Sequence, residues 1–180
     1  MRIVASACVL ILAAACPAAE LESLVLRHYI PQDLLEMAVR KEGWTEIELK
    51  VKGGIKKGDF VRVWAGGNVD WGDADQPGQN VAPPSGPAIT LDAHQCQNLA
   101  LSRDPNHAHA VLLKTDTAGP TKCLASGRAV QLPLNKDNDR LWVGFNDLRG
   151  EYKDNHLGKG RRHEFDPLWV RVEVLRIIVD

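Results

Sequence analysis

The sequence predicts an all-β protein, an antiparallel β-sandwich or jelly roll, with one short helix near the N-terminus. Short apolar runs recur along the chain, separated by clusters of Gly, Pro, Asn and Asp at intervals of roughly 8 to 15 residues. Several runs alternate apolar and polar residues with the two-residue period of a strand that buries one face. The 180 residues are enough for one ordinary domain and short for two. These features favour an antiparallel sandwich over a βαβ sheet.

Residues 1–19 have the features of a signal peptide. A basic Arg2 is followed by an apolar run over 3–15, and small residues precede Glu20. The run is too short to span a bilayer. We therefore expect export with cleavage after Ala19, and no transmembrane segment.

A lipid anchor at Cys16 is the alternative for this segment. Ala13 stands where a lipoprotein signal usually has Leu, and Pro17 follows the cysteine, so cleavage without lipid is preferred. The expected location is secreted or periplasmic, or the outer membrane as a lipoprotein if Cys16 is lipidated.

The cysteines give a further expectation. Removal of residues 1–19 removes Cys8 and Cys16 and leaves Cys96 and Cys123. Disulfides persist in oxidising compartments, and neither residue belongs to a Cys-x-x-Cys motif. We therefore predict one structural disulfide between Cys96 and Cys123.

A helical pattern follows the signal segment, over residues 21–41. Pro31 is suited to a first helical turn, an apolar stripe follows it at helical spacing, and Gly43 is suited to the end. This predicts an N-terminal helical extension over residues 20–43, ahead of a sandwich domain over residues 44–180.

Strands are predicted through the rest of the chain. Ile47, Leu49 and Val51 alternate with charged residues, and glycines end this run. The other predicted strands cover residues 60–65, 108–114, 128–134, 141–145 and 168–179. Residues 66–87 form a polar segment too long for a simple hairpin, and loops of that length are usually functional or disordered.

The most informative segment is 146–158, which concentrates oxygen-bearing side chains between turns. Calcium binds about six to eight oxygens from carboxylates, amides and backbone carbonyls, which suits an irregular loop. Asp147 and the pair Asp154 and Asn155 converge if this loop folds back. The same residues also serve as ordinary turn formers, and no EF-hand pattern is present.

The chain resembles the PA-IL type of calcium-dependent galactophilic lectins, which are galactose-binding-domain-like sandwiches. The matching residues at the loop are Phe145, Asn146, Asp147, Tyr152, Asp154, Asn155 and Gly158, followed by the strand from Leu168. Upstream matches are Gly58, Asp59, Val61, Val63, Ala65, Gly66, Trp71 and Gly72, then Ala110, Val111, Leu112, Lys114, Gly119, Gly127 and Arg128.

This resemblance implies a metal site and a sugar site. Calcium is held in such lectins by side chains like Asp147, Asp154 and Asn155 and by backbone carbonyls at positions like Glu151 and Trp71. Sugar hydroxyls bind the ion beside Asp147, Asp154 and Asn155, and a turn with the spacing of His94 and Gln97 contacts the sugar. Galactose or a related hexose is the ligand that the resemblance implies. Asp154 departs from the family's Asn by adding a negative charge.

Other functions are disfavoured by composition and motifs. With 22 basic and 23 acidic side chains mixed along the chain, no nucleic-acid partner is expected. Ser85 lies in a Pro-rich turn, no carboxylate pair suggests catalysis, and His107 with His109 lacks a third zinc ligand at a telling spacing. We therefore expect a carbohydrate-binding protein and not an enzyme.

Two alternatives stay open. One is an envelope interaction module with a structural calcium and no bound sugar, and the weaker one is a hydrolase or its accessory domain. The oligomeric state is also open, with a homo-oligomer among the alternatives.

Overall fold

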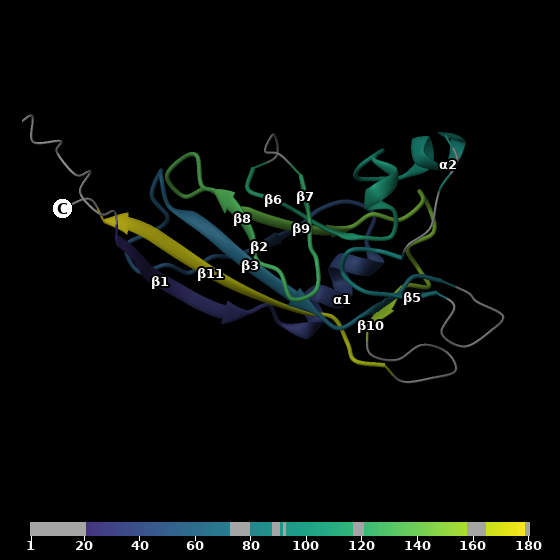
Figure 1. Cartoon of the computed structure of the whole chain (residues 1–180), viewed down its shortest axis with the longest axis horizontal. Helices are drawn as coiled ribbons and strands as arrows, with labels where there is room; N and C mark the ends of the chain where they lie inside the picture. The colour runs from purple at the N-terminus through teal and green to yellow at the C-terminus, as the bar shows by residue number, and fades with distance from the viewer. Residues whose placement is uncertain are drawn as a thin grey trace, which may run out of the picture.

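The protein is an antiparallel β-sandwich, seen in a computed structural model that describes residues 21–72, 80–87, 91, 93–116, 121–157 and 165–178 (Figure 1). One four-stranded sheet has the order β1-β11-β3-β8 and the other the order β2-β9-β6-β7. Every ladder that pairs the strands is antiparallel. The predicted fold class is confirmed. The predicted signal peptide, with Cys8 and Cys16, lies outside the described residues.

The first sheet contains the long strands of the molecule. Its strands are β1 (Leu21–Tyr29), β3 (Phe60–Gly66), β8 (Val130–Pro133) and β11 (Trp169–Ile178). The inward residues of β11 are Val170, Val172 and Val174, all fully buried, whereas Trp169 on the opposite side is exposed. The alternation in the sequence therefore correctly predicted which face packs against the core.

The second sheet completes the sandwich. It contains β2 (Thr45–Ile47), β6 (Val111–Lys114), β7 (Lys122–Cys123) and β9 (Leu141–Phe145). Its buried side chains, including Leu113, Val143 and Phe145, belong to the same hydrophobic cluster as the inward residues of the first sheet. Burial of this shared cluster holds the two sheets together. β2 ends earlier than predicted, because a tight turn from Leu49 to Val51 follows it.

The helix prediction for residues 21–41 is wrong in its first part. Residues 21–29 form β1, which pairs with β11 from Leu21↔Ile178 to Tyr29↔Arg171, with one irregularity between Leu24 and Leu26. Helix α1 (Gln32–Arg40) begins only after Pro31, whose backbone is extended. The residue that precedes a proline disfavours helical geometry, which prevents the helix from starting before Pro31. The segment ahead of Pro31 joins the edge of the sheet instead.

Short elements occupy the connections. They are β4 (Val69–Asp70), β5 (Val81–Ala82), β10 (His156–Leu157), α2 (Ala93–Asn98) and a 3-10 turn, η1 (Pro105–His107). The three strands form a small sheet of order β10-β4-β5. This small sheet joins the long polar segment 66–87 to the chain that follows β9. No helix within the described parts of the chain is long and apolar enough to cross a membrane.

Candidate functional site

A pocket of about 240 Å³ lies where the chain leaves β9. Its lining residues are Trp71, Gly72, Asn80, His109, Asp147, Leu148, Glu151 and Asp154. They come from three separate parts of the sequence. Four of them, Trp71, Asp147, Glu151 and Asp154, belong to the predicted metal site.

Backbone pairing brings these segments together. β4 pairs with both β10 and β5, which places residues 69–70 between 81–82 and 156–157. The Trp71 amide then donates to the carbonyl of Asn80 at 2.9 Å. Because β10 directly follows Asn155, the small sheet sets Trp71 opposite the loop that carries the acidic residues.

Asn146 fixes the start of that loop. The side chain is fully buried, and its Oδ1 accepts from the amides of Leu101 and Ser102 at 2.9 and 3.0 Å. Its Nδ2 donates to the carbonyls of Ser102 and His107 at 2.9 and 2.8 Å. One amide side chain therefore ties the segment from residue 101 to residue 107 to the end of β9.

Asp147 is the most buried acidic group of the pocket, only 1% exposed. Its Oδ1 accepts from the Leu148 amide at 2.7 Å and its Oδ2 accepts from Asn155 Nδ2 at 3.0 Å. His109 Nδ1 lies 3.1 Å from Oδ1 but does not meet the geometry of a hydrogen bond. Two hydrogen bonds, one to each oxygen, thus fix the orientation of the carboxylate at the pocket wall.

Asn155 is fully buried beside Asp147. Its Nδ2 donates to the Val39 carbonyl at 2.8 Å as well as to Asp147, which fixes the orientation of the amide. Its Oδ1 is buried and has no hydrogen-bond partner. Leaving a buried oxygen unpaired costs about 1–3 kcal/mol, so a water molecule or a cation bound to this atom would stabilise the loop.

Tyr152 fixes the start of the loop through hydrogen bonds of its hydroxyl group. Its hydroxyl donates to the Phe145 carbonyl at 2.9 Å and accepts from the Asp147 amide at 3.2 Å. Burial raises the pKa of Tyr152 far above its ordinary value of 10. The hydroxyl therefore stays protonated, and its hydrogen bonds join the end of β9 to Asp147.

Asp154 and Gly72 meet across the pocket. A Cβ on Gly72 would lie 3.3 Å from Asp154 Oδ2, and Gly72 has a φ of +148°. The absence of a side chain at Gly72 thus leaves room for the Asp154 carboxylate at the pocket wall.

Trp71 and His109 form the apolar wall. Their rings are stacked, with centroids 3.9 Å apart and planes 23° apart. Sequence reasoning missed His109 as a pocket residue, along with Asn80 and Leu148. His109 has a left-handed φ of 49°, and no sequence pattern signals that a histidine of this kind turns toward Asp147.

The side chains around the pocket supply oxygen donors, the type of ligand that calcium takes. Asp147, Glu151 and Asp154 line the pocket, and Asn155, which donates to Asp147, has a buried Oδ1 atom without a hydrogen-bond partner. Hard cations take such oxygens and need no sulfur or imidazole. Among the described residues no cluster of three His, Cys, Asp or Glu side chains is close enough to hold a metal ion, so amide and carbonyl oxygens must complete any set.

His94 and Gln97, the predicted sugar contacts, lie on α2. Both are exposed, and neither lines the pocket. The carbonyl of Asn98 at the end of α2 accepts from the Arg149 amide at 3.0 Å, so the helix does contact the loop. The structure therefore places the predicted sugar contacts near the loop but outside the pocket.

The predicted disulfide is not formed. Both Cys96 and Cys123 are free thiols. Cys96 Sγ contacts the Leu91 carbonyl, and Cys123 Sγ contacts the carbonyls of Ser85 and Leu124. Burial raises the pKa of Cys123 to about 11, which keeps its thiol protonated. The two residues lie on different elements, α2 and β7, and nothing in the sequence reports the distance between them.

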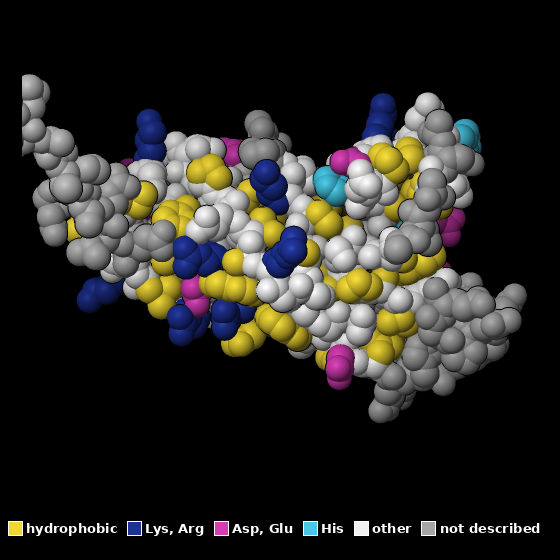
Figure 2. Space-filling model, viewed as in Figure 1, with side chains coloured by type: hydrophobic (Ala, Val, Ile, Leu, Met, Phe, Trp, Pro, Cys, Tyr) yellow, Lys and Arg dark blue, Asp and Glu magenta, His cyan; other side chains and the backbone are white. Residues whose placement is uncertain are grey.

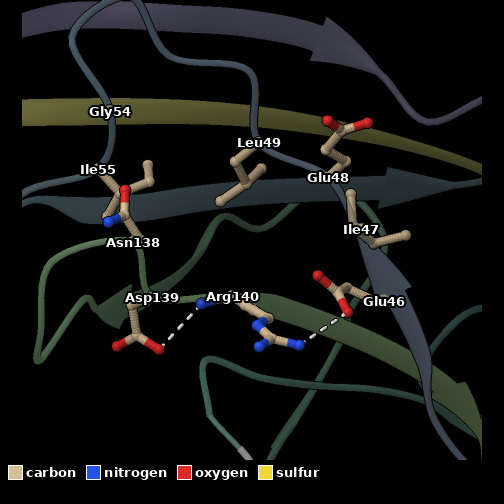
Figure 3. A pocket seen from close by; sticks show the side chains of 9 residues that line it. All are labelled: Glu46, Ile47, Glu48, Leu49, Gly54, Ile55, Asn138, Asp139 and Arg140. Carbon is tan, nitrogen blue, oxygen red and sulfur yellow. Dashed lines mark hydrogen bonds and ion pairs between the residues drawn. The ribbon is translucent and has the colours of Figure 1, made fainter.

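A second pocket, of about 300 Å³, lies at the other end of β9. It is lined by Glu46, Ile47, Glu48, Leu49, Gly54, Ile55, Asn138, Asp139 and Arg140 (Figure 3). Arg140 Nη1 lies 3.2 Å from Glu46, and Asp139 accepts from the backbone amides of Asn135 and Arg140. Glu46 is thus paired with Arg140, and Asp139 is held by backbone amides.

Comparison with known proteins gives limited information. No family model matches the chain, and no curated protein matches it. Among solved structures the chain is similar to the EclA N-terminal domain, described as a PllA-like lectin, with a TM-score of 0.41 and 16% identity over 85% of this chain and 97% of that chain. Likeness at this level assigns the chain to no family.

Proposed function

We propose that this chain is an exported, calcium-dependent carbohydrate-binding protein without enzymatic activity, whose ligand is galactose or a related hexose. The observation that carries the proposal is the convergence of Trp71, Asp147, Glu151 and Asp154 in one pocket. Trp71 lies about 80 positions before the other three residues in the sequence, which share one loop. If the acidic residues served only to form a turn, they would not need a tryptophan from another segment beside them.

The electrostatics of the pocket support a divalent cation. Asp147 is buried, Asp154 and Glu151 line the same space, and the Oδ1 atom of Asn155 has no partner. Asp147, Asp154 and Asn155 would hold the ion with their side chains, and Glu151 and Trp71 with their carbonyls. A bound calcium supplies coordination positions that two neighbouring sugar hydroxyls take.

The size of the pocket supports a small ligand. Its volume of about 240 Å³ is below the range of about 300–1,000 Å³ that is common for drug-sized ligands. Trp71 and Leu148 give it an apolar side, and Asn80 adds an amide on the rim. One sugar ring fits this combination better than a long oligosaccharide does.

The experiment compares two buried aspartates. Asp147→Asn removes a charge from the proposed site, and Asp139→Asn removes one from a carboxylate of similar burial in the other pocket. Calcium at about 100 times its Kd should stabilise the wild type by about 2.7 kcal/mol in thermal melts. Asp139→Asn should keep this stabilisation, and Asp147→Asn should lose it.

Sugar binding is tested separately. A glycan array with calcium should show retention of galactose-terminated glycans, and EDTA should remove it. Calcium-dependent melting without any sugar retention would favour the alternative, an interaction module with a structural calcium. A wild type whose melting ignores calcium would overturn both, and release of a sugar product would show an enzyme.

A further inference from the structure

The turn over residues 50–57, between β2 and β3, is rich in lysine. It contains four lysines and no acidic residue, namely Lys50, Lys52, Lys56 and Lys57. All four are exposed. Basic and acidic residues are mixed along the chain as a whole, but this lysine turn forms one locally basic surface.

Hydrogen bonds hold the lysine turn against the end of β11. Arg176 Nη2 donates to the Gly54 carbonyl at 3.0 Å, and the same guanidinium binds Asp59 at 2.8 and 2.7 Å. β11 begins opposite Gly66, near β4 and the pocket of the candidate site, and runs past Phe60 to this turn. The lysine turn and that pocket therefore lie at opposite ends of the sandwich (Figure 1).

The protein itself neutralises little of the charge on this turn. In the described part of the chain no carboxylate lies within ion-pair distance of Lys52 or Lys57. Asp137 accepts from the backbone amide of Lys57, at 2.9 Å. Lys50 lies 3.3 Å from Glu48, but their side chains are 77% and 75% exposed, and such surface pairs are weak. The lysine turn thus presents positive charge to a partner.

Aliphatic side chains are exposed at the same end. Of the six large hydrophobic side chains that are exposed in the described residues, three lie here: Leu24 (45% exposed), Ile177 (40%) and Ile178 (45%). Leu24 pairs with Leu175, which sets it diagonally across from Ile177 on one face of the sheet. Ile177 and Ile178 directly follow Arg176, which holds the lysine turn. Figure 2 shows hydrophobic and basic side chains together over the half of the molecule that contains this end.

We propose that this end of the molecule docks on an anionic phospholipid surface. The lysines lie against the headgroup phosphates, and the exposed aliphatic side chains enter the interfacial layer. Lysines gain from the negative potential of such a membrane, and aliphatic side chains gain from leaving water at the boundary of the acyl chains. The pocket of the candidate site then faces away from the membrane and stays open to a ligand.

The start of β1 agrees with this orientation. Leu21 pairs with Ile178 at the same end of the sheet. Cys16 lies five residues before Leu21, a stretch that reaches at most about 18 Å when fully extended. A lipid anchor at Cys16, the alternative for the signal segment, would therefore tether the end that carries the lysine turn.

Charge and apolar exposure together decide between the other occupants. A second copy docked through the same end would bring two lysine turns together, which like-charge repulsion opposes. A nucleic acid would bind the lysines through its phosphates but would leave the aliphatic side chains in water. An anionic membrane surface uses both groups.

The test is co-flotation of the mature chain, residues 20–180, with lipid vesicles. This chain keeps every described residue and lacks the apolar run over 3–15, which would bind lipid by itself. EDTA is present throughout, so that no calcium bridges the protein to the headgroups. Vesicles of phosphatidylcholine and phosphatidylglycerol in equal parts should float the protein, and phosphatidylcholine alone should not. At about 1 M salt, where the screening length is about 3 Å, flotation should be lost.

Two kinds of variant locate the surface. Lys52→Gln and Lys57→Gln should each weaken vesicle binding about fivefold, the contribution of one lysine near an anionic membrane. Ile177→Thr should weaken it about fourfold, because about one methylene group less leaves water. The controls are Lys153→Gln, an exposed lysine in the loop of the candidate site, and Met37→Gln, 45% exposed on α1. Both controls should float like the wild type, and thermal melts should show all five variants folded.

Several outcomes would overturn the proposal. They are equal flotation with phosphatidylcholine alone, the same loss in Lys153→Gln as in Lys57→Gln, or no loss in Ile177→Thr. Tighter binding of a single-stranded oligonucleotide than of the mixed vesicles, or a dimer that Ile177→Thr dissociates, would also overturn it. Asp147→Asn should float like the wild type, because the docking uses neither the pocket nor its ion. Membrane docking and calcium-dependent sugar binding can therefore fail independently.

Discussion

At the scale of single residues, Asn146 is the side chain on which the candidate site depends most. Its four hydrogen bonds join the end of β9 to residues 101, 102 and 107, and it is fully buried. Asn146→Ala should lower the free energy of unfolding by about 2–4 kcal/mol, since several backbone groups lose their partner inside the protein. Urea denaturation measures this loss.

The control is Asn106→Ala. Asn106 is exposed and its side chain makes a local bond to Asp104. Its loss should cost less than about 1 kcal/mol. Equal losses in the two variants would show that the buried amide is not what fixes the loop.

Gly67, between β3 and β4, forms the turn that leads the chain toward Trp71. It has a φ of +75°, and a Cβ there would lie 1.9 Å from the Pro167 carbonyl oxygen. Gly53 has a similar φ of +83° with nothing within 4 Å. Gly53→Ala should therefore cost only the left-handed backbone strain of about 1–2 kcal/mol, and Gly67→Ala should cost clearly more.

Chemical denaturation of both variants separates the steric overlap with Pro167 at Gly67 from the backbone strain that both positions share. The difference between them reports the contact with the segment ahead of β11. If the two alanine variants were equally stable, the close approach at Gly67 would be absent in solution.

At the scale of elements, alternation predicted the strands that lie in the middle of the sheets. β3, β9 and β11 agree closely with the predicted ranges because each has one face in the core, which leaves a two-residue signal in the sequence. β1 has no such clear signal, since it lies at the sheet edge with residues of intermediate exposure. Its state is decided by pairing with β11, a partner more than 140 residues away, which no local pattern contains.

The residues of the candidate site also fall into those that local sequence predicted and those that depend on long-range pairing. Asp147, Asp154 and Asn155 share one loop, and local composition and resemblance were enough to select them. His109 and Asn80 reach the pocket only through the pairing of small strands and through a left-handed backbone. The disulfide prediction failed for the same reason, because it used the compartment and the cysteine count but no information on distance.

An ion pair links β11 to the turn before β3. Arg176 binds both carboxylate oxygens of Asp59, at 2.8 and 2.7 Å, and the Lys56 amide adds a bond of 2.8 Å. Burial alone would raise the pKa of Asp59, but the hydrogen bonds from Arg176 and Lys56 hold it below its ordinary value of 3.8. A lowered pKa in the folded state means that the pair stabilises the protein above pH 3.8 and stops doing so as pH falls through the lowered value.

Asp59→Asn should therefore cost about 2–3 kcal/mol at pH 7, the usual value of hydrogen bonds to charged groups. As the pH falls through the lowered pKa, the difference from the wild type should shrink, because Asp59 then becomes protonated in the folded state as well. Asp137→Asn, which removes an exposed carboxylate that accepts from the Lys57 amide, should change the stability little at any pH in this range. Denaturation series from pH 7 down through the acid range measure this, and a difference that is independent of pH would contradict the role of the charge.

At the scale of the whole molecule, the N-terminal helix supports the loop of the candidate site. The Val39 carbonyl accepts from Asn155, Glu36 accepts from the Leu157 amide at 3.0 Å, and Arg40 donates to the Lys153 carbonyl at 3.1 Å. Helix α1 is thus connected at three points to the stretch that follows Asp147. The helix, predicted as an extension outside the sandwich, is part of the framework of the pocket.

This arrangement gives a prediction for the effect of calcium on the entire chain. Because the pocket joins segments near residues 71, 80, 109 and 147–155, an ion that binds there should slow amide hydrogen exchange in all of them together. At about 100 times the Kd, opening of the site should become up to about 100-fold rarer. Protection should extend to the Leu157 amide, which is bound by Glu36 on α1.

The second pocket supplies the internal reference for this measurement. The amides of Asn135 and Arg140, held by Asp139 at the far end of β9, should exchange at the same rate with and without calcium. In Asp147→Asn the calcium effect should vanish in every segment at once, since one ion accounts for all of it. Protection confined to residues 147–155 would mean that the ion orders only its own loop, and that Trp71 takes no part in holding it.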